Sequence, residues 1–559
     1  MFASWLFKWN YRRFLAACET PLEAQASQLR RILRQAAGTD IGRRCDFAGL
    51  SRLADPVALI RAYQERVPIR SYRDMRADLD AVYAGEWQRL CPSRPVFFAM
   101  TAGSTGQFKC IPVTREYRRE VGRGSLIFNG ALEANYPALR GLKCQFLVGS
   151  AEGGVTPAGA PQGFVSGFNY KNLPRFVRDR FALPYWIFTL HDADDRGYAA
   201  GRLLVAERQL GALCAISPVN LINLKRALEE NAERLCTDIA AGTLTLRGTA
   251  AVEGSWRGTP DPALAEALRE AREREGRFPV RLLFPSLQVL VCWQGGNMGY
   301  YLHELDSEFG LDQHFEFPVS ASEGLFAIPC RRNQAGGVLA VTTHFLEFLP
   351  EDHSGAAPPE ALRADQLDVG ATYRIVVTTS GGLYRYDMED LVRVTGMSGR
   401  TPVIEFIAKV GRQVSVANER LNEGDVTVAM QAASQACDLW VHDFLFVPCS
   451  DRRYRVVVDE GALAPLTVPG HETPLRDFAT ELERQLRVAA KGYDFERDDA
   501  LLEPLQLVVA SAGELAERVA QRRTGQALPN AQVKPMHLTN QFDAHTSFTA
   551  MGTYAAHGG

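Results

Sequence analysis

The chain has 559 residues and a mass of 61.8 kDa, and 46% of its residues are apolar and 23% charged. This composition is typical of a soluble globular protein and excludes global disorder. Lys and Arg total 62 against 65 Asp and Glu, for a net charge of -3. Without a basic surplus, nucleic acid is not an expected partner.

The Cys and His residues argue against disulfides and structural metals. The 11 Cys include no C-x-x-C pair, and the ten His show no close metal-ligand spacing. This pattern is typical of reduced thiols in a cytoplasmic protein. No apolar run is long enough to span a membrane. The aromatic stretch Trp5–Phe14 fits a packed helix or a membrane-surface helix, and we favour the packed helix. We therefore expect a cytoplasmic location and no membrane partner.

The predicted elements change in character along the chain. Roughly the first 90 residues read as helices, most clearly over Leu22–Ala36. Apolar strand-like runs alternating with helical patterns follow, which favours an α/β fold with an added antiparallel sheet. These runs are Pro95–Met100, Gln145–Val148, Leu282–Trp293, Val338–Leu349, Tyr373–Thr378 and Val403–Ile407. After about residue 409 the elements shorten, with strands at Phe444–Pro448, Tyr454–Val458 and Leu505–Val509 and a helix at Leu475–Val488.

The segment Phe97–Thr114 is the most informative in the chain. An apolar strand leads into Thr101-Ala102-Gly103-Ser104-Thr105-Gly106, and Lys109 follows three residues after the last Gly. Glycines let backbone N–H groups approach phosphate oxygens, hydroxyls add donors and the Lys adds positive charge. The segment is not a Walker A loop. Taken alone, it fits phosphate binding and an ordinary hairpin turn equally well.

Two acidic segments support a nucleotide site. Glu323 lies in Ala321–Gly324 after an apolar patch, and a lone carboxylate there suits a Mg²⁺ ion that bridges phosphates. Gly382–Val392 contains aromatic residues, an Arg and three carboxylates, of which Asp390 could accept both hydroxyls of a ribose. Each segment alone also fits a solvated or salt-bridged turn.

Lysine is rare in this chain, since only eight of the 62 basic residues are Lys. Where Arg supplies nearly all the positive charge, each Lys calls for a reason, because a compact ammonium suits crowded phosphate chemistry. Lys109 lies in the glycine-rich segment, Lys409 at the predicted domain junction and Lys534 in a polar loop near the C-terminus.

Taken in chain order, these segments resemble the GH3 family of acyl acid amido synthetases in the adenylate-forming superfamily. The resemblance is to a bacterial-type member of that family. The family's T-S-G-T-T-G-x-P-K and I-P-x-T patterns are matched at 101–114. Its S-S-E-G is matched at Ala321–Gly324 and its G-L-Y-R-Y-x-x-G-D at Gly382–Asp390, and its C-terminal Q-x-K-x-P-type segment resembles Gln532–Pro535. The order and spacing of the four motifs support the resemblance more strongly than any single motif.

The resemblance implies two domains. Residues 1–408 would form an ATP- and acyl-acid-binding domain of α/β class, with layered sheets, flanking helices and a β-barrel-like subdomain. Residues 409–559 would form a small, mobile α+β lid domain. ATP and Mg²⁺ are the implied cofactors, and a carboxylic (acyl) acid and an amine, usually an amino acid, are the implied substrates.

The resemblance also implies a role for each motif residue. Lys534 and Glu323 would be catalytic, and Glu323 would hold the Mg²⁺ ion. ATP would contact residues from all four motifs and the junction: Thr101, Gly103, Ser104, Thr105, Gly106, Lys109, Ser322, Tyr386, Asp390, Lys409 and Lys534. The acyl acid would contact Met298, Phe326, Phe164 and Phe168, although core packing explains these apolar residues equally well.

The chain departs from the family pattern without losing a charged residue of the expected site. Ala102 removes one hydroxyl from the phosphate loop, and Glu389 replaces a Gly and adds negative charge beside Asp390. Phe108, Lys409 and Arg420 are further departures.

The implied reaction has two steps. A carboxylate attacks the α-phosphate of ATP to give an acyl-adenylate and pyrophosphate, and an amine then displaces AMP to form an amide. At ~4 Å and an effective dielectric constant near 20, each like-charge pair costs about 4 kcal/mol, so positive charge must be placed on the phosphates. Two alternatives stay open: acyl transfer to coenzyme A or a carrier thiol, and a non-catalytic small-molecule binder.

Overall fold

The structure is a computed structural model that describes the chain apart from residues 1, 103–107, 249–255, 352–359, 411–413, 418, 420, 464–472, 516, 518–535 and 557–559. The chain divides into two compact units, Met1–Phe406 and Ile407–Gly559. The expected roles of 1–408 as the ATP- and acyl-binding domain and of 409–559 as a lid stay predictions.

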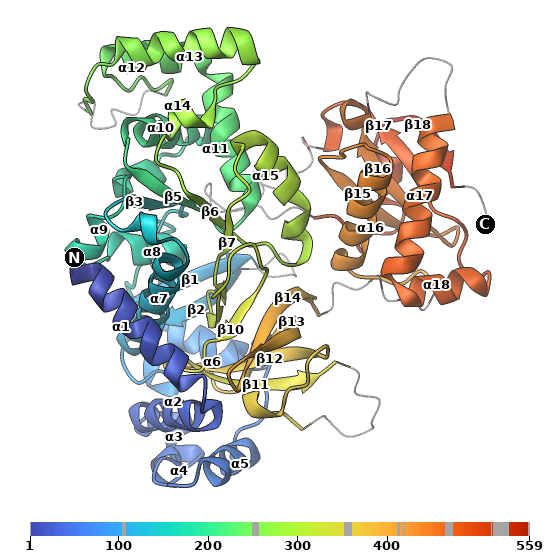
Figure 1. The fold of residues 1–559 in the computed structure, drawn as a ribbon. Helices are drawn as coiled ribbons and strands as arrows, with labels where there is room; N and C mark the ends of the chain where they lie inside the picture. Colours follow the sequence, from blue (N-terminus) through green and yellow to red (C-terminus); the bar gives the residue numbers. More distant parts are fainter. Residues whose placement is uncertain are drawn as a thin grey trace. The chain divides into compact units, whose positions relative to one another are not determined.

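Helices fill the first part of the larger unit, as the sequence predicts (Figure 1). They are α1 (Phe2–Ala17), α2 (Pro21–Ala36), α3 (Asp40–Arg44), α4 (Phe47–Leu50), α5 (Pro56–Arg66) and α6 (Tyr72–Ala84). Helix α1 packs against α7 (Arg115–Asn135) and buries Phe7 and Phe14. Trp5 and Trp9 stack on each other at the surface. The packed interpretation of this segment is confirmed, and no helix in the described part of the chain has the length and apolarity needed to cross a membrane.

The glycine-rich segment lies in a β-hairpin that leads directly into a helix. Strands β1 (Phe97–Ala102) and β2 (Phe108–Val113) are antiparallel, and their register places Thr101 opposite Lys109. Strand β4 (Gln162–Gly163) pairs with β1 in parallel. Thr114 caps α7, because its Oγ1 accepts a hydrogen bond from the Tyr117 N–H at 3.1 Å.

A parallel sheet forms a second layer, in the order β3 (Lys143–Phe146), β5 (Leu210–Cys214), β6 (Val289–Cys292) and β7 (His314–Glu316). Strands β5 and β6 are buried throughout, as expected where helices cover a parallel sheet. The predicted continuous strand Leu282–Trp293 is wrong in its first half, because Leu282 lies in helix α14 and Pro285 separates that helix from β6. The other helices here are α8 (Val165–Lys171), α9 (Arg175–Arg178), α10 (Ala193–Ala206), α11 (Pro218–Glu230), α12 (Ala232–Ala241), α13 (Pro262–Glu275), α14 (Val280–Leu283) and α15 (Leu302–Phe309).

The larger unit also contains a seven-stranded sheet (Figure 1), and the β-barrel-like subdomain that the resemblance implies stays a prediction. The order of the sheet is β11 (Phe345–Pro350), β12 (Thr372–Thr378), β13 (Tyr386–Ser398), β14 (Thr401–Lys409), β10 (Gly337–Leu339), β9 (Gly324–Ile328) and β8 (Val319–Ala321). The prediction of one alternating strand over Val338–Leu349 is wrong. A turn closed by the hydrogen bond from Thr343 N to the Ala340 carbonyl separates β10 from β11.

The smaller unit contains the strands and the helix that the sequence predicts, but these elements are not shorter than those of the larger unit. Its sheet runs β15 (Phe444–Cys449), β16 (Arg453–Asp459), β17 (Gln506–Ala510) and β18 (Ala550–Ala555), with β16 and β17 parallel. Its helices are α16 (Glu423–Ala436), α17 (Thr473–Ala489) and α18 (Lys491–Asp498). Helix α17 buries Leu475, Phe478, Leu482 and Leu486 at helical spacing, so its apolar stripe faces the core of this unit.

Candidate functional site

Predicted nucleotide-binding residues of the larger unit lie around Tyr386, the first residue of β13. The Lys109 ammonium donates a hydrogen bond to the Tyr386 hydroxyl at 3.3 Å. Burial raises the pKa of Tyr386, and the negative charge of Glu323 raises it further. Glu389 and Asp390, on the same strand, act in the same direction. Strand β2 therefore brings an ammonium into hydrogen-bond contact with the Tyr386 hydroxyl, and the turn between β8 and β9 and the start of β13 place three carboxylates within electrostatic range of it.

Lys109 also lies over an aromatic ring. Its Nζ is 5.2 Å from the centroid of Tyr72, at the start of α6, which favours the ammonium by a cation–π interaction. The Tyr72 hydroxyl accepts the Cys110 N–H at 3.1 Å, which fixes the ring against β2. Sequence reasoning missed Tyr72, because it precedes the motif by a whole helix and a connector.

The Ser322–Gly324 turn joins β8 to β9 and holds the predicted Mg²⁺ ligand. Glu323 is only 6% exposed. The Tyr117 hydroxyl donates to the Ser322 carbonyl at 2.7 Å, and burial together with the charge of Glu323 raises the pKa of Tyr117. At Gly324 a Cβ atom would lie 2.9 Å from Phe326 Cε1 and 3.0 Å from His344 Cδ2. This close packing explains the Gly of the motif.

Asp390, the predicted ribose ligand, lies in an irregular part of β13. Arg374 pairs with Leu391 and Val376 with Asp387, so β13 carries extra residues between these pairs. Glu389 has φ +56°, and its N–H donates to Asp387 Oδ1 at 2.9 Å. A left-handed conformation costs a residue with a Cβ atom about 1 kcal/mol, which the Gly of the family pattern avoids.

Arg385, between the two tyrosines of this motif, supports the fold. Its Nε lies 3.1 Å and its Nη2 3.0 Å from the Glu347 carboxylate, and both side chains are buried. Its Nη1 donates to the carbonyls of Gln64 and Val67 at 2.9 and 2.8 Å. The guanidinium thus joins the end of α5 to β11, because a buried charge needs such partners.

Several predicted residues lie outside the described part of the larger unit, so the structure does not test their place in this cluster. Gly103, Ser104, Thr105, Gly106 and Lys534 lie outside the described residues, as does Arg420. Lys409 is the last residue of β14 and belongs to the smaller unit. The contributions of these residues to an ATP site stay predictions.

The residues proposed for the acyl acid are apolar packing residues in this structure. Met298, Phe326 and Phe168 are buried, and Phe164 is half-buried. The Phe168 ring stacks on Phe97 at 4.2 Å between centroids, and the Ser217 hydroxyl donates to the Met298 sulfur at 3.4 Å. These contacts would exist in any tightly packed core, so the acyl pocket stays a prediction.

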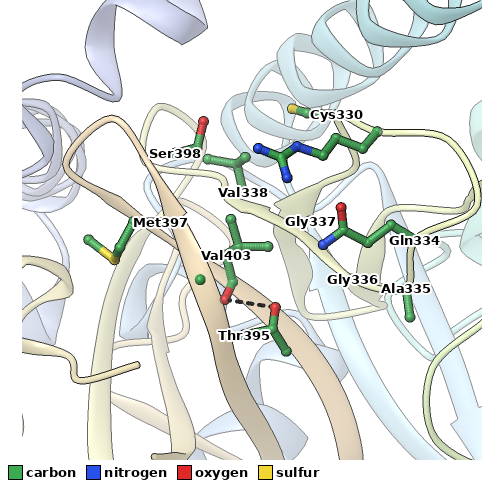
Figure 2. Close-up of a pocket in the computed structure, with 12 residues that line it drawn as sticks. Cys330, Gln334, Ala335, Gly336, Gly337, Val338, Thr395, Met397, Ser398 and Val403 are labelled. Carbon is green, nitrogen blue, oxygen red and sulfur yellow. Dashed lines mark hydrogen bonds between the residues drawn. The ribbon is translucent and has the colours of Figure 1, made fainter. Parts of the chain in front are cut away.

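A surface hollow of about 90 Å³ lies elsewhere on the larger unit. It is lined by the loop that leads into β10 and by the β13–β14 hairpin, where the Thr395 hydroxyl donates to the Val403 carbonyl (Figure 2). The hollow contains none of the predicted site residues, so we assign it no part in the nucleotide site.

Two family models match this chain. Residues 10–313 match the GH3 family N-terminal domain, and residues 337–409 match the GH3 family central domain. The chain belongs to the GH3 family. It is 26% identical over 451 residues to indole-3-acetic acid-amido synthetase GH3.8 of Oryza sativa subsp. indica, covering 76% of this chain and 72% of that protein. It is 24% identical over 550 residues to indole-3-acetic acid-amido synthetase GH3.4 of Arabidopsis thaliana, covering 93% and 88%.

A solved structure confirms the fold. The AtGH3.15 acyl acid amido synthetase in complex with 2,4-DB matches with a TM-score of 0.82 and 20% identity, over 97% of this GH3 chain and 96% of that one. At that identity the likeness shows the fold alone. The predicted mixed α/β fold with a large N-terminal and a smaller C-terminal portion is confirmed. The two relatives named by sequence are plant proteins, so they give no support to the expected bacterial type.

Proposed function

We propose that this chain is an ATP-dependent acyl acid amido synthetase that forms an acyl-adenylate and then an amide. Its GH3 relatives carry the name amido synthetase. The observation that supports the proposal is the arrangement of Lys109, Glu323 and Asp390 around Tyr386. A nucleotide needs an ammonium for its phosphates, a carboxylate for its cation and a carboxylate for its ribose, and these three residues supply them.

The residues present fit a Mg²⁺ ion bound together with ATP. Such an ion keeps several waters and takes one or two carboxylates plus phosphate oxygens, and Glu323 offers one buried carboxylate. When bound, the ion neutralises phosphate charge. Lys109 and the 101–106 loop bind the phosphates, Asp390 binds the ribose, and Lys534 contributes the charge between the acyl carboxylate and the α-phosphate.

The relatives indicate the substrate class. Indole-3-acetic acid, which the names of the sequence relatives contain, is a carboxylic acid attached to an aromatic ring system. We propose a carboxylic acid of this general kind, contacting Met298, Phe326, Phe164 and Phe168, and an amino acid as the amine. We place the enzyme in the cytoplasm, where ATP is available and its free Cys residues stay reduced. We also propose that the chain is a bacterial-type member of the family.

Exchange of labelled pyrophosphate into ATP tests the first step. Purified protein with Mg²⁺ should catalyse exchange with at least one member of a carboxylic-acid panel, and the product of an amine screen should have the mass of the amide. Release of AMP that depends on an amine supports the synthetase, whereas release that depends on a thiol supports transfer to coenzyme A or a carrier. Absence of exchange across a broad panel supports the non-catalytic binder.

Lys534 gives the first testable prediction. Lys534→Ala should lower pyrophosphate exchange by about 10² to 10³, the cost of losing one charge that stabilises a transition state. Lys491→Ala removes another of the rare lysines from the smaller unit, on α18, and should leave exchange near the wild-type rate. Thermal unfolding should show both variants folded. Exchange at the wild-type rate in Lys534→Ala refutes the role of this residue.

A further inference from the structure

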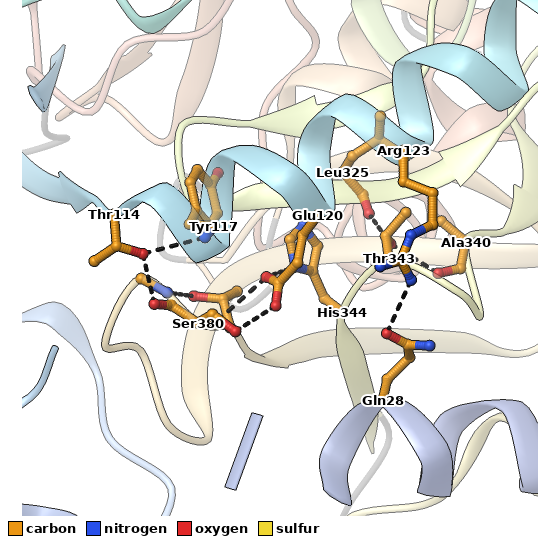
Figure 3. A network of polar contacts seen from close by, with 12 residues as sticks. Gln28, Thr114, Tyr117, Glu120, Arg123, Leu325, Ala340, Thr343, His344 and Ser380 are labelled. Carbon is orange, nitrogen blue, oxygen red and sulfur yellow. Dashed lines mark hydrogen bonds and ion pairs between the residues drawn. The ribbon is translucent and has the colours of Figure 1, made fainter. Parts of the chain in front are cut away.

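The three described segments of the proposed nucleotide site are connected through Glu120, a buried residue on α7. Its side chain is fully buried and accepts hydrogen bonds from the Ser380 N–H and hydroxyl. Its carboxylate also lies 2.7 Å from Arg31 Nη2 and 2.9 Å from His344 Nδ1. Figure 3 shows Glu120 between Ser380 and His344. We call Glu120, Ser380, His344 and Tyr117 the Glu120 network.

One side of the Glu120 network joins the phosphate hairpin to the ribose segment. Ser380 immediately precedes the glycine pair that opens the Gly382–Asp390 motif. Its carbonyl accepts the Thr114 hydroxyl at 2.8 Å, and Thr114 directly follows strand β2, which carries Lys109. A displacement of Ser380 would therefore displace both the hairpin that carries Lys109 and the Gly382–Asp390 segment.

The other side of the network supports the Ser322–Gly324 turn. Tyr117 lies one turn before Glu120 on α7, and its ring stacks on the His344 imidazole with centroids 5.6 Å apart and an interplanar angle of 15°. Its hydroxyl holds the Ser322 carbonyl at 2.7 Å. The other edge of the imidazole lies against Gly324, and His344 Nε2 is buried without a hydrogen-bond partner among the described residues. The turn therefore packs on the Tyr117–His344 ring pair.

The carboxylate of Glu120 has to be ionised to accept all these hydrogen bonds. Burial alone would raise its pKa, but the hydrogen bond from His344 and the positive charge of Arg31 lower the pKa overall. An ionised carboxylate is an acceptor at both oxygens, whereas a protonated acid or an amide would bring a hydrogen toward another donor. The negative charge of Glu120 is thus satisfied inside the core.

We propose that Glu120 and His344 are positioning residues that align the Lys109 hairpin, the Glu323 turn and the Asp390 segment for binding of ATP with Mg²⁺. This inference rests on the proposed function of that site. Neither residue is part of a motif that the sequence analysis singled out, and both act through neighbours that support the segments expected to contact the nucleotide. Loss of either should impair nucleotide binding beyond any loss of stability.

Two substitutions at His344 distinguish a role in positioning the site from a role in core packing alone. His344→Leu keeps an apolar body but loses the hydrogen bond to Glu120, and it should weaken binding of a non-hydrolysable ATP analogue with Mg²⁺ by about 10- to 100-fold, as loss of an outer partner of a metal ligand does. His344→Asn can donate from near the position of Nδ1, so it should restore most of the binding. Isothermal titration calorimetry measures the affinity, and pyrophosphate exchange measures the rate.

Tyr117→Phe tests the link to the Glu323 turn with a smaller change. It removes only the hydroxyl that holds the Ser322 carbonyl, so the Mg²⁺ concentration for half-maximal exchange should rise several-fold. Tyr136→Phe is the matched control, because this buried tyrosine likewise donates its hydroxyl to a carbonyl, that of His314 at 3.1 Å. The control should keep the wild-type Mg²⁺ requirement while showing a similar loss of thermal stability.

The outcomes separate this inference from the proposed function. Wild-type protein that neither binds the analogue nor exchanges pyrophosphate overturns the proposed function itself. Wild-type protein that does both, with His344→Leu and Tyr117→Phe binding equally well and only melting earlier, overturns the positioning role. If His344→Leu does not fold, the comparison of Tyr117→Phe with Tyr136→Phe decides alone.

Discussion

Glu316, the last residue of β7, buries a carboxyl group at the end of the parallel sheet. It is 2% exposed, and its Oε2 accepts the Gln294 N–H at 2.8 Å. Burial raises its pKa well above the ordinary value, and the charge of Glu405 adds to this, while the Gln294 N–H offsets only part. The folded chain therefore binds a proton here more tightly than the unfolded chain does. The stability that this provides is present at low pH and is lost as pH rises through the folded-state pKa.

Glu316→Gln should therefore stabilise the protein at alkaline pH. The amide keeps the shape and the acceptor for Gln294 but needs no proton, and each unit of pKa shift is worth about 1.4 kcal/mol. Urea unfolding at pH 8 should give a higher free energy of unfolding than for the wild type, and the difference should shrink toward pH 5. Glu230→Gln, on the exposed end of α11, is the control and should change neither value. Lower stability of Glu316→Gln at pH 8 contradicts the argument.

At the scale of elements, the irregular part of β13 sets the place of Asp390. Glu389 combines a left-handed backbone with a negative charge beside the proposed ribose ligand. Both properties oppose what the site needs, since one costs folding energy and the other repels a polyanion. The family pattern has Gly at this position, which carries no charge and adopts a left-handed backbone without strain.

Two substitutions of Glu389, in the irregular part of β13, distinguish the effect of its strained backbone from the effect of its negative charge. Glu389→Gly removes both, whereas Glu389→Ala removes the charge and keeps the strained backbone. Both should lower the KM for ATP in pyrophosphate exchange by a few-fold. In urea unfolding, Glu389→Gly should be more stable than Glu389→Ala by about 1 kcal/mol, because Ala at positive φ carries the strain. Equal stabilities of the two variants would show that the bulge is unstrained.

The sequence predicted those residues of the candidate site that are coded locally. Lys109, Glu323 and Asp390 each lie in a short pattern whose residue types match the chemistry expected of them, so the order of the patterns was enough to propose them. Tyr117 and His344 were missed, because they meet their partners from far along the chain: Tyr117 contacts Ser322 across 205 residues, and Glu120 contacts His344 across 224. Such contacts depend on the packing of α7 against the antiparallel sheet, which no local pattern encodes.

The same distinction explains the errors in the predicted strands. Apolar runs located half of the described strands of the larger unit and most of those of the smaller unit, since buried strands need apolar residues on their inward faces. The run Val338–Leu349 is apolar in two stretches, but its turn residues Thr343 and His344 are buried and hydrogen-bonded inside the core. A buried turn of this kind lacks the exposed Gly, Pro, Asn or Asp residues that usually mark a turn in a sequence. The sequence therefore predicted β10 and β11 as one strand.

At the scale of the whole molecule, one buried imidazole makes the stability of the smaller unit depend on pH. His537 lies three residues after Lys534 and stacks on Phe444 with centroids 4.1 Å apart. Its Nδ1–H donates to the Phe444 carbonyl at 3.1 Å, and its backbone N–H donates to Glu423 Oε1 at 2.7 Å. Burial lowers the pKa of His537 to about 4, and the hydrogen bond to Phe444 offsets only a little of this. The chain beyond Lys534 is thus anchored to β15 and α16 by a neutral side chain.

Acid should therefore loosen this anchor. The unfolded chain binds the proton of this His below about pH 6.5, so the stability of the smaller unit is intact above that value and falls by about 1.4 kcal/mol per pH unit toward pH 4. Because the proposed catalytic residue Lys534 precedes His537 by only three residues in the sequence, pyrophosphate exchange should decline over this window. His537→Asn keeps a donor for Phe444 without titrating. Hydrogen-exchange protection in its smaller unit should therefore change less between pH 6.5 and 5 than in the wild type.

His545 in the same unit also has a pKa lowered by burial, so His545→Asn is the matched control. An acid profile that is the same for the wild type and His537→Asn, and altered in His545→Asn, assigns the effect to His545 and removes His537 from the argument.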